Sequence, residues 1–140
     1  MNLTIQTGVG VGPIRFGMTR SETRMLLPIA PETFRRTDED VSDIDEYADL
    51  GVYVEFDEQD RCIAVEMFEP ADPVLQGMHL LKTPFATIRE WLRKNDPNLE
   101  KEEGGVYSSL LGVGLAADIP KRDTRSFAES AIAFAAGYYD

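Results

Sequence analysis

The sequence predicts an α+β fold, in which an antiparallel sheet carries two helices on one face. Three observations predict it: alternating apolar and polar residues within 51–68, helix signatures near residues 19 and 83, and a helix-then-strands pattern that recurs after about 60 residues. Successive strands joined by short turns pair antiparallel, and a helix with one apolar side packs on such a sheet as a second layer. With 140 residues, the chain fits a single domain.

The first helix is predicted from its N-terminal residues. Thr19 and Glu22 have the spacing of a capping box, in which each side chain accepts a hydrogen bond from the other residue's backbone N–H. Pro28 ends the helix, because it has no N–H to donate. The glycine-rich segment 8–13 that precedes it lacks the Gly-Lys-Ser/Thr of a phosphate loop, so we interpret it as a turn.

A β-hairpin is predicted over residues 51–68. Apolar residues alternate with polar ones in 51–57 and again in 62–68, the period-two pattern of half-buried strands, and residues 58–61 form the turn. Upstream, 33–36 is a candidate strand, and the acidic run after it is expected to be a loop.

The second helix is predicted to begin at Thr83 as N-cap, with Pro84 in the first turn, where a missing N–H costs nothing. Apolar residues at i, i+3, i+6 and i+7 are expected to face the core. They are Phe85, Ile88, Trp91 and Leu92. Further short strands are expected at 78–81, 106–111, 113–117 and 130–135.

The two halves of the chain, about 1–72 and 73–140, have similar layouts. Residues 47–56 resemble 107–116 with one inserted residue, and 62–68 resembles 130–134 in pattern. We interpret this as a tandem duplication of an α-β-β(-β) unit, with chance similarity of two apolar hairpins as the alternative.

The net charge of −11 is concentrated in one segment. Residues 38–72 contain 14 of the 25 acidic residues and one of the 14 basic residues, a segment charge of −13. Such a surface repels phosphate backbones, so direct binding of nucleic acid is not expected. It attracts a basic protein and steers its association. Acidic loops that only maintain solubility are the alternative.

The residues that usually carry catalysis are scarce. His79 is the only histidine and has apolar neighbours, which favours a packed or edge-strand position. Cys62 is the only cysteine and lies in a predicted strand, so neither a zinc site nor an activated thiol is expected. Asp43 and Asp45 offer oxygen ligands, but this loop lacks the glycine and glutamate of an EF-hand. We therefore expect no enzyme, no metal site and no cofactor.

The partner-binding residues are predicted in and beside the acidic run. Tyr47 and Tyr53 flank the run, and aromatic anchors among carboxylates suit a basic protein partner. The predicted set is Asp38, Glu39, Asp40, Asp43, Asp45, Glu46, Tyr47, Asp49 and Tyr53.

A cytoplasmic location is expected. Residues 1–7 contain neither a basic cluster nor an apolar run, so no signal peptide is predicted. No stretch approaches the roughly 20 apolar residues that span a membrane, and a single cysteine forms no internal disulfide.

Residues 12–27, Gly-Pro-Ile-Arg-Phe-Gly-Met-Thr-Arg-Ser-Glu-Thr-Arg-Met-Leu-Leu, resemble the opening of small bacterial proteins with a repeated helix-and-strands unit. The Gly-Met-Thr helix start is similar to that of the BamE outer-membrane assembly lipoproteins and of β-lactamase-inhibitor-like domains. Gly112-Val-Gly-Leu and the terminal Phe134-Ala-Ala-Gly-Tyr-Tyr resemble segments of bacterial proteins associated with toxin–immunity loci. The chain has no lipobox cysteine, which argues against an envelope role.

The resemblance implies a bacterial immunity or inhibitor protein, which neutralises a toxin or enzyme by stoichiometric binding through an acidic face. Two alternatives remain open from the residues themselves. One is a non-catalytic structural or interaction module. The other is a small-molecule or cation-dependent enzyme that uses the acidic loop.

Overall fold

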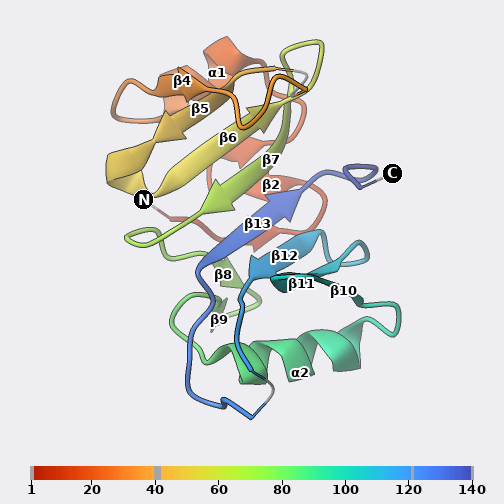
Figure 1. The fold of residues 1–140 in the computed structure, drawn as a ribbon. Coiled ribbons are helices and arrows are strands. Elements are labelled where there is room, and N and C mark those ends of the chain that lie inside the picture. The colour runs from red at the N-terminus through yellow and green to blue at the C-terminus, as the bar shows by residue number, and fades with distance from the viewer. Residues whose placement is uncertain (1, 40–41, 121, 140) are drawn as a thin grey trace.

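The computed structural model describes residues 2–39, 42–120 and 122–139, and its centre is an eight-stranded sheet (Figure 1). Neighbouring strands are antiparallel throughout, in the order β10-β11-β12-β13-β7-β6-β5-β4. The strands are β4 (Glu32–Phe34), β5 (Ile44–Tyr47), β6 (Val52–Phe56), β7 (Cys62–Met67), β10 (Glu100–Glu102), β11 (Gly105–Ser108), β12 (Val113–Ala116) and β13 (Ser130–Phe134). The predicted α+β class with an antiparallel sheet is confirmed.

Two α-helices accompany the sheet, α1 (Arg20–Leu26) near β4 and β5 and α2 (Phe85–Asn95) beyond β12 (Figure 1). The capping box of α1 is confirmed, since Thr19 Oγ1 accepts from the Glu22 N–H and Glu22 Oε1 accepts from the Thr19 N–H. The N-cap of α2 is Pro84 rather than the predicted Thr83, and no side chain caps it.

Shorter elements complete the structure. They are the 3₁₀ helix η1 (Ala48–Leu50), a three-stranded sheet of β1 (Ile5–Gln6), β2 (Gly10–Val11) and β3 (Ile14–Arg15), and a two-stranded sheet of β8 (Val74–Leu75) and β9 (Met78–His79). In the glycine-rich segment 8–13, Gly10–Val11 therefore forms the middle strand of this small sheet, and the residues on either side of it form the predicted turn structure. Within the described ranges, no helix is both long enough and apolar enough to cross a bilayer.

The α-helix and the strands of the large sheet follow one another in the same order in the two halves of the chain. Each half contributes one α-helix followed by four strands of the large sheet, α1-β4-β5-β6-β7 and α2-β10-β11-β12-β13. The last strands of the two halves, β7 and β13, pair at the centre, and the earlier strands follow outward in matching order. The predicted duplication remains a prediction, because matching order alone does not establish common origin.

One face of the sheet, here called the buried face, forms the core. Side chains alternate between the faces of a strand, and those of this face are nearly inaccessible to solvent. They include Val52, Val54, Val65, Met67, Val113 and Leu115. They form one cluster with apolar residues of β1 to β3 and with Phe85, Ile88 and Leu92 of α2. Trp91, expected in the same stripe, is only half-buried and packs at the edge of this cluster.

One strand lies where the sequence indicated a polar loop, and another lies where no strand was expected. Ile44–Tyr47 forms β5 and Glu100–Glu102 forms β10. Both segments are rich in acidic residues, which are depleted in strands generally. Charged residues do occur on edge strands, where they discourage further pairing, and β10 is such an edge.

Candidate functional site

The predicted acidic site is divided between the two faces of the sheet and its loops. Asp38 and Glu39 are exposed between β4 and β5, and Asp49 is exposed on η1. Asp40 lies outside the described residues. The half-buried Asp43 pairs with Arg35, with 2.7 Å between Asp43 Oδ1 and Arg35 Nε.

Asp45 and Tyr47 lie on the buried face, so their expected place on a partner surface is corrected. Asp45 is 0% exposed and Tyr47 1% exposed. Arg20 Nη1 donates to Asp45 Oδ1 at 2.6 Å, and Arg24 donates to both carboxylate oxygens at 2.8 Å. The Arg20 guanidinium also lies 4.1 Å from the centre of the Phe56 ring. This arrangement ties α1 to the sheet.

The opposite face of the sheet carries a row of directly opposed residues that crosses all eight strands. From β4 to β10 the row is Glu32, Glu46, Tyr53, Glu66, Ile132, Gly114, Tyr107 and Glu100. Glu55 and Glu102 point to the same side, because each lies two residues beyond a member of the row. We call the row with these two glutamates the acidic face.

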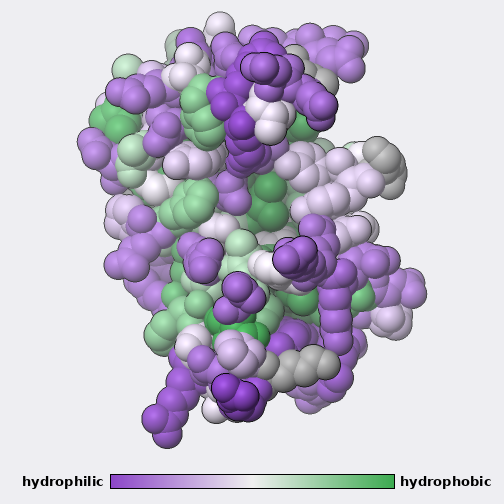
Figure 2. Space-filling model, in the orientation of Figure 1, coloured by the Kyte–Doolittle hydropathy of each residue, from purple (hydrophilic) through white to green (hydrophobic). Residues whose placement is uncertain are grey.

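The acidic face has an electrostatic cost. Glu32 and Glu46 are direct cross-strand partners, and like charges in that position destabilise a sheet. Hydrophilic side chains also gather around α1 and β4 on the side of the molecule drawn in Figure 2. Of the eight predicted residues that the structure describes, only Glu46 and Tyr53 belong to the acidic face, where Tyr53 Oη donates to Glu46 Oε1 at 3.4 Å.

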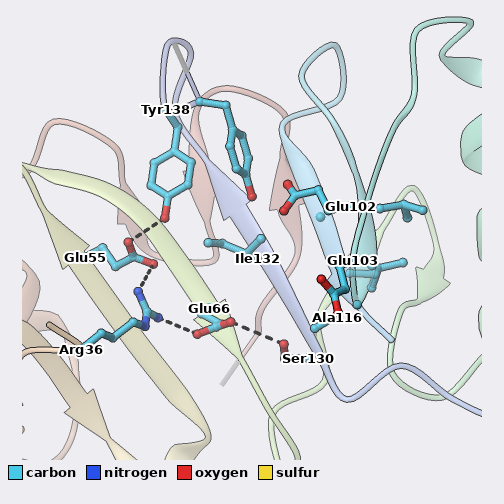
Figure 3. A pocket seen from close by; sticks show the side chains of 15 residues that line it. Arg36, Glu55, Glu66, Glu102, Glu103, Ala116, Ser130, Ile132 and Tyr138 are labelled. Carbon is cyan, nitrogen blue, oxygen red and sulfur yellow. Dashed lines mark hydrogen bonds and ion pairs between the residues drawn. The ribbon is translucent and has the colours of Figure 1, made fainter. Parts of the chain in front are cut away.

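A cavity of about 290 Å³ opens in the middle of the acidic face (Figure 3). Arg36 enters it from the loop after β4 and bridges two glutamates of neighbouring strands. Its Nη2 lies 2.7 Å from Glu66 Oε1 and its Nη1 lies 3.3 Å from Glu55 Oε2. Tyr138 Oη donates to Glu55 Oε1 at 2.7 Å. The C-terminal segment is thereby fixed against the acidic face.

Burial changes the proton affinities of the groups in this cavity. It raises the pKa of Glu66, and the neighbouring Glu55 charge adds to the rise, while Arg36 opposes it. Burial, followed by the negative charge of Glu102, raises the pKa of Tyr139 to about 12. The pKa of Tyr138 is raised by burial and by Glu55. Both phenols therefore remain neutral hydrogen-bond donors at physiological pH.

Aromatic rings lie near both ends of the acidic face. Tyr107 and Tyr139 stack with their ring centres 4.0 Å apart. At the other end, the Tyr53 ring contacts Phe34 at 5.3 Å and Phe68 at 4.7 Å. Acidic and aromatic side chains therefore lie side by side across the sheet, a composition that suits recognition of a cationic protein surface.

Sequence reasoning missed most of this face. The alternation in 52–56 and 62–67 already placed Tyr53, Glu55 and Glu66 together on the polar side of the hairpin, and that signal could have found them. The contributions of Arg36 and Tyr138 had no local signal, because each reaches its partners across more than 15 residues of sequence.

The remaining reactive groups form no comparable site. His79 is exposed on β9, and its Nδ1 lies 2.9 Å from Asp72 Oδ2. Cys62 is buried in β7, and burial raises the pKa of its thiol to about 12. Among the described residues, no three histidine, cysteine or carboxylate side chains are grouped to hold a metal ion.

Comparison with known proteins identifies no relative. No protein-family model matches the chain, and no match was found among curated proteins or solved structures. The acidic face is therefore the feature from which a function can be inferred.

Proposed function

We propose that the protein binds a basic protein partner stoichiometrically through the acidic face, and that it acts as a bacterial cytoplasmic immunity or inhibitor protein rather than as an enzyme. The observation that carries the proposal is the row of opposed residues across all eight strands, in which four glutamates and two tyrosines occupy six of the eight positions. A surface of that width suits a protein partner better than a small molecule.

The cost of the acidic face supports a binding role. Opposed Glu32 and Glu46 and the desolvated Glu66 all weaken the isolated fold. Residues that break the rules of stable folding without local compensation are expected at functional sites. A partner with arginine and lysine side chains would neutralise these charges, so the energetic cost would be recovered on binding.

We also propose two features of the fold, the origin of its two units and the placement of its helices. The two helix-plus-four-strand units arose by duplication, and both helices cover the buried face, which leaves the acidic face to the partner. The contacts of Arg20 and Arg24 with Asp45, and the hydrogen bond from Ser108 Oγ to Asp96 Oδ2 after α2, support this placement.

Co-expression with the product of the adjacent open reading frame tests the proposal. We expect a one-to-one complex and protection of cell growth. The double variant Glu46→Lys/Glu100→Lys should lose both, because it reverses charges near the two ends of the row. Glu90→Lys on α2 is the matched control, since Glu90 is exposed and pairs only locally with Arg93.

The outcomes separate the alternatives. A complex without growth protection would favour the interaction module over the immunity protein. If the complex still forms with the double variant, the acidic face is not the binding surface. The same conclusion follows if the Glu90→Lys control loses the complex to the same extent as the double variant. Association should also slow as salt rises, because exposed charges are screened beyond about 8 Å at physiological ionic strength.

A further inference from the structure

A second cavity lies between α2, the β10–β11 hairpin and the segment that follows β12, at the end of the molecule where α2 lies in Figure 1. Its volume is about 340 Å³, within the range of about 300–1,000 Å³ that is usual for sites of small molecules. The lining combines apolar side chains with three cations. They are Phe85, Val106 and Ile119 with Arg89, Arg93 and Lys101. We call this cavity the basic cleft.

Two elements bring the three cations together. Arg89 and Arg93 are one helical turn apart on α2 and therefore lie on the same side of the helix. Lys101 is the middle residue of β10 and lies directly opposite Val106, which packs in the core cluster. Cross-strand partners share a face of the sheet, so Lys101 points away from the acidic face that its two neighbours in β10 occupy. The edge strand thus has its carboxylates on one face and its ammonium group on the other.

Two of these cations have no counter-ion. Arg93 pairs with Glu90 of its own helix, with 2.6 Å between Arg93 Nη2 and Glu90 Oε2. Arg89 and Lys101 form no ion pair with any carboxylate in the described part of the chain, although the sequence has 25 acidic residues against 14 basic ones. The cleft is also lined by one carboxylate that belongs to the acidic face and by one that is exposed to solvent. They are Glu102 and Asp118.

The Arg89 guanidinium is held in place by an aromatic ring. Its Cζ lies 5.4 Å from the centre of the Phe85 ring, and Phe85 is only 3% exposed. A guanidinium on a ring face keeps the N–H donors at its edge free for a planar anionic group. Those of the half-buried Arg89 donate no hydrogen bond within the described chain. A positioned cation with unused donors therefore lies beside an open cavity, and this arrangement is independent of how many charges surround it.

We infer that the basic cleft binds a small organic anion, whose carboxylate or phosphate group is held by Arg89 and Lys101 and whose body lies against Ile119. Guanidinium binds both kinds of anionic group through two parallel hydrogen bonds. Ile119 is half-buried and lines the cleft, so part of its side chain is accessible to the ligand. This inference does not rest on the proposed function, because the residues that hold the anion lie on α2 and on the opposite face of β10 from the acidic face.

NMR titration of the whole chain with phenyl phosphate, benzoate and the neutral benzamide tests the inference through the amide shifts of Val106 and Ile119. We expect saturable binding of at least one of the two anions, and the preferred anion identifies the group that the cleft recognises. Benzamide should bind at least about tenfold more weakly than that anion, because it makes no charge-assisted contact.

Three variants with the same change of charge locate the site. Arg89→Gln should weaken binding of the preferred anion about tenfold or more, and Lys101→Gln about threefold or more, because each removes a charge-assisted contact. Lys94→Gln is the matched control, since Lys94 is exposed on α2 and lies outside the lining of the basic cleft. Its affinity should equal that of the unaltered chain.

The inference would be overturned if neither anion binds saturably, or if benzamide binds as tightly as the anions. Equal affinity of all three variants, each folded by circular dichroism, would also overturn it, because attraction to the whole charge of the molecule would then explain the binding. If Arg89→Gln fails to fold, the comparison of Lys101→Gln with Lys94→Gln decides, since Lys101 is exposed on an edge strand.

Discussion

The two faces of the sheet each hold a cluster of arginines and carboxylates, and the two clusters are built in opposite ways. On the buried face, two arginines of α1 bind the single carboxylate of Asp45. On the acidic face, Arg36 alone serves both Glu55 and Glu66. The first cluster satisfies its carboxylate fully, while the second leaves negative charge unbalanced beside a cavity. The comparison indicates that the first cluster holds the fold together, whereas the second belongs to the face through which we propose that the partner binds.

The largest effect should come from breaking the buried cluster. Asp45→Asn leaves Arg20, whose side chain is 13% exposed, with only the solvent-exposed Asp60 as a carboxylate partner. Removing one partner of a buried ion pair costs about 3–5 kcal/mol, and we expect about 3 kcal/mol here because Arg24 is more exposed. Urea denaturation measures the change. Asp43→Asn is the control, since the Arg35 and Asp43 side chains are both nearly half exposed, and such a pair should contribute at most about 1 kcal/mol. Equal losses in the two variants would remove the distinction between structural and surface pairs.

The apolar packing of the buried face should give the next largest effect. Leu92 is 0% exposed, so Leu92→Ala should lower the free energy of unfolding by about 2–5 kcal/mol. Trp91→Ala should cost less than the 3–5 kcal/mol typical of a buried tryptophan, because Trp91 is only half-buried. Thermal or urea unfolding of both variants provides the comparison. A greater loss for Trp91→Ala would show that the edge of the core matters more than its centre.

These residues also show what the sequence could predict. The hairpin, the two helices and the antiparallel α+β class follow from periodicity and capping, which are local signals. Asp45 was assigned to a solvated loop, because no local pattern announces that two arginines 21 and 25 residues away will bind it. Trp91 satisfied the helical period, yet its exposure depends on how the helix is rotated against the sheet. The cavity was missed for the same reason, since it brings together residues from 36 to 139.

A smaller effect is expected in the pH dependence of stability, and it comes from Glu66 on the acidic face. Burial raises the pKa of Glu66 in the folded state above its unfolded value. The folded state therefore binds this proton more tightly. The stabilisation from Glu66 is full below the unfolded pKa and is lost as pH rises through the folded pKa. Glu66→Gln should remove that contribution to the pH dependence, measured as the difference in urea midpoints between the variant and the unaltered chain from pH 4 to 7. If protonation of Glu66 at low pH instead lowers the stability of the unaltered chain, the ion pair with Arg36 has a larger effect on the pKa of Glu66 than burial has.

The smallest expected effect concerns the outer end of the acidic face and has the opposite sign. Glu32 is exposed and faces Glu46 directly across β4 and β5. Relief of a like-charge cross-strand pair is worth roughly 0.2–1 kcal/mol, so Glu32→Gln should stabilise the fold slightly while slowing association with a basic partner. The double variant Glu32→Gln/Glu46→Gln should gain little more than either single change, because one repulsion is removed only once. Additive gains would show that the two carboxylates do not repel one another. The acidic face would then lack the electrostatic cost that supports a binding role, and it would serve only to keep the protein soluble.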